Sequence, residues 1–314
     1  MDTTSLLHPD VVAALENVAF PIISAETLPS LRDFTVPGVP LSDAVDRTDI
    51  VVCDDPYIVI RVHRPRSVDI AGGSVGAALP CLYSMHGGGY VLGNRSMDDA
   101  RFDRWCPMFG CIGVSVEYRL APGTPYPGPL EDCYTGLRWI VDNADSLGID
   151  RSRIGIGGVS AGGGLAAGLA LLARDRAEIP LSFQLLECPM IDDRQKTSSS
   201  QLDGLPIWSR ESNTFGWQSY LGDLYGSDDV PYFAAPARAT DLSGLPAAFI
   251  SVGSVDGFRD EDITYAMRLN QAGVAAELHV YPGLPHGAAL FAGIPGVAQW
   301  QHNLDDWVGR QFAQ

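Results

Sequence analysis

Positive charge is scarce in this sequence. The 21 lysines and arginines face 38 aspartates and glutamates, which gives a formal net charge of −17, and Lys196 is the single lysine. Nucleic acids and anionic membrane surfaces are bound through basic surfaces, so this composition argues against both as partners. An acidic, solvated surface that favours solubility accounts for the charge. We therefore expect no nucleic-acid partner.

Long apolar runs and paired cysteines are lacking as well. No stretch approaches the ~18 apolar residues of a membrane-spanning helix, and the start at Met1 has no basic region of the kind that opens a signal peptide. Six cysteines are scattered, mostly within apolar runs, without a Cys-x-x-Cys pair: Cys53, Cys81, Cys106, Cys111, Cys133 and Cys188. This predicts buried free thiols, a cytoplasmic location and no membrane insertion, with a Cys106–Cys111 bridge left open as the alternative.

Strands and helices alternate along most of the 314 residues. Period-two or continuous apolar runs predict strands at 48–53, 57–63, 80–85, 111–116, 153–157, 181–187, 247–252 and 276–281, the first two forming an antiparallel hairpin. Helical periodicity predicts helices at 10–20, 97–109, 129–147, 165–176, 260–271 and from Val297 to Phe312. The alternation predicts the α/β class, with a mostly parallel sheet flanked by helices on both faces.

Residues 188–244 interrupt this rhythm. A structureless connection of that length is implausible in a compact domain, and the aromatic residues Trp208, Phe215 and Trp217 predict a helix within it. We expect this insertion to cover one end of the sheet together with the N-terminal helix. The segment 21–45 shows no period, and we expect it to pack over another part of the chain.

The segment 157–164 reads strand, then Gly158-x-Ser160-x-Gly162, then helix. This is the context of a nucleophile elbow, a strained turn that lifts a serine hydroxyl above a sheet edge. Glycines flank Ser160 because side chains there would collide with the neighbouring strand and helix. We therefore predict that Ser160 is a catalytic nucleophile.

An elbow serine needs a base, which follows it in the chain together with an acid. Three histidines come after Ser160. His279 lies within a predicted strand and His302 within the last predicted helix. His286 alone follows a strand end, in a proline-rich loop from which it can reach the serine. We predict His286 as the base.

The acid is expected after the strand at 247–252, because working residues of such sheets lie at the carboxyl ends of strands. Asp256 occupies that place. Residues 260–262 are also acidic, but they fall in the first turn of the next predicted helix, where the helix dipole favours negative charge whatever the function. We therefore interpret those three as caps and predict Asp256 as the acid.

Donors for an oxyanion are expected from backbone N–H groups. His86-Gly87-Gly88-Gly89 leaves a predicted strand with a backbone free of side chains, and Ala161, the residue after the serine, supplies a further N–H. A run of glycines is a weak signal alone. It becomes specific two strands before a Gly-x-Ser-x-Gly elbow, because hydrolases pair these two elements.

Other chemistries find little support in the sequence. The acidic pairs Asp192-Asp193 and Asp228-Asp229 fall in predicted loops and are interpreted as solvated turns, and no His-Glu-x-x-His helix is present. The glycines at 162–164 lack the Gly-Lys-Ser/Thr ending of a phosphate loop. We therefore predict neither a metal nor another cofactor.

From about residue 48 onward, the chain resembles the hormone-sensitive-lipase-like branch of the α/β-hydrolase carboxylesterases. Five ordered motifs carry the resemblance: His86-Gly-Gly-Gly89, Tyr118-Arg-Leu-Ala-Pro122, Gly158-Val-Ser-Ala-Gly-Gly163, Asp256 with Arg259-Asp260-Glu261, and Pro285-His286-Gly287. The resemblance implies an α/β-hydrolase fold with an eight-stranded sheet and a small helical cap. It divides the chain into an N-terminal cap segment, 1–47, and a catalytic domain, 48–314, in which 188–244 adds a second cap.

The resemblance also implies cofactor-free hydrolysis of small to medium carboxylic esters. Its catalytic residues map to Ser160, Asp256 and His286, and its oxyanion donors map to the backbone N–H groups of Gly88, Gly89 and Ala161. Lactone hydrolysis by the same groups, or small-molecule binding without catalysis, are the alternatives. By family analogy, the edge strand at 276–281 could pair two copies into a homodimer.

The chain departs from the family pattern at three positions. Val159 stands where the family often has Asp, Gly123 where it often has Glu, and Phe258 where it often has Leu. None of these changes removes a reacting group, so the predicted chemistry is unaffected and the choice of substrate is left open.

Overall fold

The computed structural model describes residues 3–16, 18, 20–33, 40–66, 77–291 and 293–313. Its centre is one sheet of eight strands in the order β1-β2-β4-β3-β5-β6-β7-β8. The strands are β1 (Val45–Asp54), β2 (Tyr57–Pro65), β3 (Leu79–Met85), β4 (Ile112–Glu117), β5 (Ile149–Val159), β6 (Phe183–Glu187), β7 (Ala247–Val255) and β8 (Ala276–Pro285). β2 runs antiparallel to both β1 and β4, and all other neighbouring strands are parallel. The predicted fold class is confirmed.

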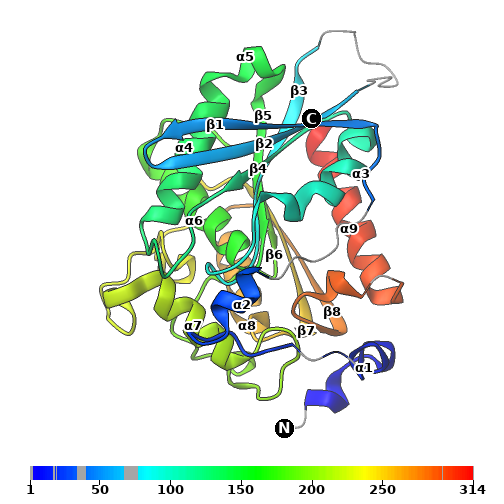
Figure 1. Cartoon of the computed structure of the whole chain (residues 1–314), viewed down its shortest axis with the longest axis vertical. Helices are drawn as coiled ribbons and strands as arrows, with labels where there is room; N and C mark the ends of the chain where they lie inside the picture. The colour runs from blue at the N-terminus through cyan, green and yellow to red at the C-terminus, as the bar shows by residue number, and fades with distance from the viewer. Residues whose placement is uncertain are drawn as a thin grey trace.

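Helices cover both faces of the sheet (Figure 1). They are α1 (Pro9–Leu15), α2 (Leu28–Asp33), α3 (Asp99–Phe109), α4 (Gly128–Asp142), α5 (Ala144–Leu147), α6 (Ala161–Arg176), α7 (Arg210–Leu221), α8 (Arg259–Gln271) and α9 (Pro295–Phe312). The apolar side chains of α3 and α9 share one core cluster, and those of α4, α6 and α8 share the other. The sheet therefore separates two cores.

Strand β3 shows how the sequence feeds these two cores. Its side chains alternate between the faces of the pleated strand: Tyr83 and Met85 belong to the cluster on the α4–α6–α8 side, whereas Leu82 belongs to the cluster on the α3–α9 side. All seven residues of β3 are buried. A continuous apolar run is what a strand covered on both faces requires.

Two predicted helices differ from the structure. The helix predicted over 129–147 divides into α4 and α5 at Asn143, whose side-chain amide donates to the Trp139 carbonyl and competes with the helical pattern. The helix predicted over 10–20 ends at Leu15, where the amide of the capping residue Glu16 donates to the Ala13 carbonyl in a tighter last turn; Ala19 lies outside the described residues. Helix α2 was not predicted, since six residues are too few to show a helical period.

Helices α1, α2 and α7 gather at one end of the molecule, at the bottom of Figure 1. The Ile23 amide donates to Ser212 Oγ in α7 at 2.9 Å, so the N-terminal segment and the 188–244 segment are joined by a buried hydrogen bond. The His8 amide donates to the Gly283 carbonyl in β8 at 2.9 Å. The described helices include none with the length and apolar character that crossing a membrane requires.

Candidate active site

Ser160 stands between β5 and α6 in a strained backbone conformation. Its φ is 58° and its ψ is −122°, a region that residues other than glycine rarely adopt. The Ser160 amide donates to the Glu187 carbonyl of β6 at 2.8 Å, and its carbonyl accepts from Met190 at 2.9 Å. The chain therefore holds this turn from both sides.

The glycines around Ser160 are required by close approach. A Cβ built on Gly162 would lie 2.0 Å from the Met85 carbonyl oxygen at the end of β3, and one on Gly158 would lie 2.3 Å from Gly162 C. Both distances are far below any real contact, so only glycine permits helix α6 to leave the sheet here. The collision expected from the sequence is confirmed.

His286 and Asp256 meet Ser160 although they come from different strands. Ser160 Oγ lies 2.9 Å from His286 Nε2, and His286 Nδ1 lies 2.8 Å from Asp256 Oδ2. The other carboxylate oxygen of Asp256 accepts the Phe258 amide at 2.9 Å. All three side chains are buried, and His286 is 6% exposed. In this order, the imidazole can take the serine proton while the carboxylate orients the ring and stabilises the imidazolium that forms.

The glycine loop after β3 lies against this group. A Cβ built on Gly87 would lie 3.5 Å from Ser160 Cβ. Gly88 and Gly89 have φ values of 117° and 60°, and a Cβ on Gly88 would lie 2.2 Å from the Leu92 carbonyl oxygen. Ala161 is the first residue of α6, where helical N–H groups have no partner in their own helix. Backbone donors from two elements thus border the serine.

His86 and Tyr118 hold the start of the glycine loop through contacts to its backbone carbonyls. Their rings stack with centroids 4.1 Å apart, and Tyr118 Oη donates to the His86 carbonyl at 2.8 Å. His86 Nδ1 lies 2.8 Å from the Gly87 carbonyl oxygen, so the tautomer with a proton on Nδ1 donates a hydrogen bond to that carbonyl. Burial lowers the pKa of His86, which keeps the ring neutral near pH 7. The Tyr-Arg-Leu-Ala-Pro motif therefore serves the shape of the loop.

The 188–244 segment closes over the group through Trp208 and Ile207. A Cβ built on Gly89 would lie 2.0 Å from Trp208 Cη2, and the Trp208 and His286 ring centroids are 6.3 Å apart. Ile207 has a φ of 69°, an outlier for a β-branched residue. Strained backbone is common at binding sites. Here the residue after the strained Ile207 is Trp208, whose indole lies against the glycine loop.

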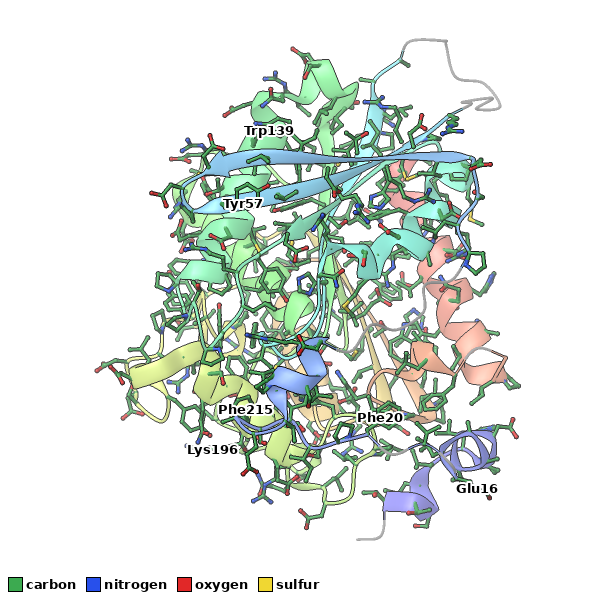
Figure 2. The ribbon with its side chains drawn as sticks, viewed as in Figure 1. Glu16, Phe20, Tyr57, Trp139, Lys196 and Phe215 are labelled. Carbon is green, nitrogen blue, oxygen red and sulfur yellow. The ribbon has the colours of Figure 1, made fainter. Side chains whose placement is uncertain are left out.

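A separate cavity of about 850 Å³ lies between α2 and α7, with Leu28, Pro29 and Phe215 in its largely apolar lining. Figure 2 shows Phe215 beside α2. Ser160, Asp256 and His286 do not line this cavity.

The acidic residues after Asp256 are not simple caps. Glu261 Oε1 accepts the amides of Ile191 and Asp192 at 3.1 Å each, which fixes the loop that follows β6. Asp262 is fully buried, and neither carboxyl oxygen has a hydrogen-bond partner within the described residues. Burial, followed by the nearby Glu261 and Asp256 charges, raises the pKa of Asp262 well above its ordinary value. The three residues do lie in the first turn of α8, as predicted, but the cap residue Phe258 makes no side-chain cap hydrogen bond, and Glu261 and Asp262 are buried within the fold.

The pair Asp192-Asp193 is also not a solvated turn. Both side chains are buried; Asp192 pairs with Arg194 and Asp193 with Arg238, at 2.7 Å in each case. Buried carboxylates of this kind are normally paired. Arg194 directly follows the pair in the sequence, whereas Arg238 comes 45 residues later and is brought in by the fold.

Cys188 is a neighbour of the site that the sequence did not reveal. It follows β6 with a φ of 38° and is buried, and all six cysteines are free thiols. One ligand atom each from Cys188, Asp256 and His286 lies within 4.8 Å of the others. Burial, then the charge of Asp256, raises the pKa of the Cys188 thiol well above its ordinary value. No sequence motif marks it, since strand pairing alone brings it there.

Comparison with known proteins agrees with this geometry. The family described as having an alpha/beta hydrolase fold matches residues 82–290. The chain is 41% identical over 217 residues to carboxylesterase NlhH of Mycobacterium tuberculosis, covering 68% of each chain. It is 30% identical over 295 residues to an ethyl acetate hydrolase of Pseudomonas putida, covering 89% of this chain and 91% of that one.

Among solved structures, a bacterial heroin esterase superposes with a TM-score of 0.89 at 37% identity, covering 99% of both chains. Sequence and structure point to the same group of enzymes, and the resemblance seen in the motifs is confirmed. The chain belongs to the α/β-hydrolase fold family, in its hormone-sensitive-lipase-like branch of serine carboxylic ester hydrolases.

Proposed function

We propose that Ser160, His286 and Asp256 form the catalytic triad of this esterase, and that the ester's acyl group is carried on Ser160. The observation that supports the proposal is the continuous hydrogen-bonded line from Ser160 Oγ to His286 at 2.9 Å and from His286 to Asp256 at 2.8 Å. It lies at the carboxyl ends of the strands, where α/β sheets bind ligands.

The proposed reaction begins when Ser160 Oγ attacks the ester carbonyl carbon while His286 Nε2 takes the hydroxyl proton. Asp256 holds Nδ1–H in place and stabilises the imidazolium that forms. The oxyanion accepts hydrogen bonds from the amides of Gly88, Gly89 and Ala161. His286 then protonates the leaving alcohol, and a water molecule releases the acid by the same steps in reverse.

We propose that the segments 1–47 and 188–244 form a cap over a catalytic domain spanning 48–314, and we call them the cap below. The indole of Trp208 lies against Gly89, which narrows the space above the glycine loop. A short acyl group fits this restriction better than a long one. The name of the ethyl acetate hydrolase relative supports the same substrate class, small to medium esters.

A serine-directed fluorophosphonate probe tests the assignment. The wild-type chain is expected to be labelled once and to lose its esterase activity, whereas Ser160→Ala is expected to resist labelling. Equal labelling of both chains would refute Ser160 as the nucleophile. Absence of labelling from the wild type would favour a protein that binds small molecules without catalysis.

A substrate panel separates the nearest alternative. Lactones open by the same triad chemistry, so rates on p-nitrophenyl esters of graded acyl length are compared with rates on five- and six-membered lactones. We expect kcat/KM to be highest for the shortest acyl groups and to exceed that of every lactone. A lactone turned over faster than all esters would reassign the substrate class.

We also propose a cytoplasmic homodimer. β8 is an edge strand of the sheet, and an exposed edge can pair with a second copy. Five of the six free thiols are buried, which suits a reducing compartment. Light scattering coupled to size exclusion is expected to give twice the 33.6 kDa chain mass; a monomer mass would refute the dimer.

A further inference from the structure

The thiol of Cys188 has no part in the proposed reaction, yet it lies beside the two residues that activate Ser160. One ligand atom from each of Cys188, Asp256 and His286 lies within 4.8 Å of the other two, and all three residues are buried. Within the described ranges, this is the only group of three such side chains close enough to share a metal ion. A sulfur, a nitrogen and an oxygen therefore lie within reach of one another.

This donor set is selective. Thiolate and imidazole prefer soft or borderline cations such as Zn²⁺ and Cd²⁺, and a carboxylate completes three protein ligands of a four-coordinate site. We propose that Cys188, Asp256 and His286 form an inhibitory binding site for a thiophilic divalent cation. The binding itself is independent of the proposed function, whereas the inhibition rests on it.

The protein holds the three donors in place before any ion arrives. The Cys188 amide donates to the Ser251 carbonyl of β7 at 2.6 Å, and the Gly287 amide faces the Cys188 sulfur. Phe258 packs edge-on against the His286 ring, with centroids 4.9 Å apart. Two adjacent strands and one loop thus fix the positions, which reduces the ordering that binding requires.

The imidazole and carboxylate atoms require little rearrangement. His286 Nδ1 and Asp256 Oδ2 are 2.8 Å apart as hydrogen-bond partners. Two such ligands on one tetrahedral Zn²⁺, each about 2.0–2.1 Å from the metal, are roughly 3.3 Å from one another. The ion can therefore replace the proton between these two atoms once they move apart by about half an ångström.

Binding displaces protons in a way that stops catalysis. The Cys188 sulfur forms a bond to the metal as its S–H proton leaves to solvent. Nδ1 of His286 also binds the metal and gives up its proton, while Nε2 takes one up from solvent. The ring then carries Nε2–H toward Ser160, so it has no lone pair there to accept the hydroxyl proton. Asp256, now bound to the metal, no longer accepts the hydrogen bond from Nδ1 that holds the imidazole in place.

The first experiment measures binding without needing activity. Ser160→Ala keeps the three donors and turns over no substrate. Competition with a chromophoric zinc chelator is expected to show one Zn²⁺ per chain, and adding Cys188→Ala to this variant is expected to weaken binding at least about tenfold. Equal affinity in the two chains, or no binding to Ser160→Ala, would overturn the proposal even if the enzyme proved inactive on every ester tested.

The second experiment measures inhibition relative to each variant's own rate without metal. Zn²⁺ and Cd²⁺ are expected to inhibit the wild type, with full recovery on adding EDTA. Cys188→Ala is expected to raise the inhibitory concentration at least about tenfold, and Cys188→Ser serves if the alanine variant fails to fold. The control is Cys53→Ser, which removes the most exposed thiol and is expected to leave inhibition unchanged. Relief of inhibition by Cys53→Ser but not at position 188 would place the effect on a surface thiol and refute the site.

Discussion

The strand-end site and the cap are held together by different means. At the strand ends, close backbone packing holds the Ser160 turn in place. A Cβ on Gly162 would lie only 2.0 Å from the Met85 carbonyl oxygen. In the cap, side chains reach to backbone: Arg32 Nε donates to the Val91 carbonyl at 2.9 Å and Arg32 Nη2 to the Ala121 carbonyl at 2.7 Å. Backbone contacts leave almost no freedom, so changes at the strand ends should cost far more than changes in the cap.

The largest effect is expected from Asp256→Asn at the strand ends. Replacing the carboxylate leaves the imidazole without the partner that fixes its tautomer, and kcat is expected to fall about 10⁴-fold. Asp260→Asn is the control, because Asp260 accepts from the Ser199 amide at 2.8 Å and pairs with Arg259; its kcat is expected to stay within about threefold. A reversed order in steady-state kinetics would show that the acid lies at residue 260.

A second variant tests where the two regions touch. Gly89→Ala puts a methyl group into the Trp208 ring at a φ of 60°, so the loop must move, and the proposed oxyanion donor moves with it. We expect kcat to fall about 10²-fold. Adding Trp208→Ala is expected to recover at least about threefold, with the rest lost to backbone strain. Trp208→Ala alone is the control, and a double variant no faster than Gly89→Ala would exclude the ring as the obstacle.

A third variant concerns the buried carboxyl of Asp262, close to the strand ends. Its raised pKa means that the folded chain keeps the proton where the unfolded chain, with a pKa of about 3.9, has lost it. This contribution to stability is present below pH ~4 and is lost as the pH rises toward the folded-state pKa. Asp262→Asn should therefore make the fall in unfolding free energy between pH 5 and 7 less steep, by up to about 1.4 kcal/mol per pH unit.

Urea titrations at several pH values measure that slope. The neighbouring Asp260→Asn serves as the control, because Asp260 is half-buried, paired with Arg259 and has a lowered pKa. An identical slope in the wild type and Asp262→Asn would mean that Asp262 is ionised in the folded chain.

The smallest effect is expected in the cap. Arg32→Met keeps an unbranched apolar stem but removes the guanidinium and both hydrogen bonds to the Val91 and Ala121 carbonyls. Each such bond contributes about 1 kcal/mol, so the melting temperature should fall by a few degrees. Because these contacts lie outside the reacting group, kcat should change less than about threefold. A loss of kcat comparable to that of Asp256→Asn would contradict the expectation that changes in the cap cost less activity than changes at the strand ends.

Local patterns in the sequence predicted the strand-end region well. The elbow follows from two glycines and a serine between a strand and a helix, and the places of Asp256 and His286 follow from the strands that precede them. Strand alternation and helical period depend on residues a few positions apart, so they can be read directly. The cap was predicted less well, because α2 is too short to show a period and α1 ends at Leu15 although the apolar pattern runs on beyond it.

By itself, the sequence determined the fold class, the eight strands and the order of the serine, acid and histidine. Only the tertiary structure decided that Cys188 lies beside Asp256 and His286, that Glu261 binds the loop after β6, and that Trp208 rests on Gly89. These contacts join residues 68 to 119 positions apart. The first two arise when parallel strands align their ends, and the third when the 188–244 segment folds over the glycine loop. No periodicity within one segment records which side chains such long-range contacts bring together.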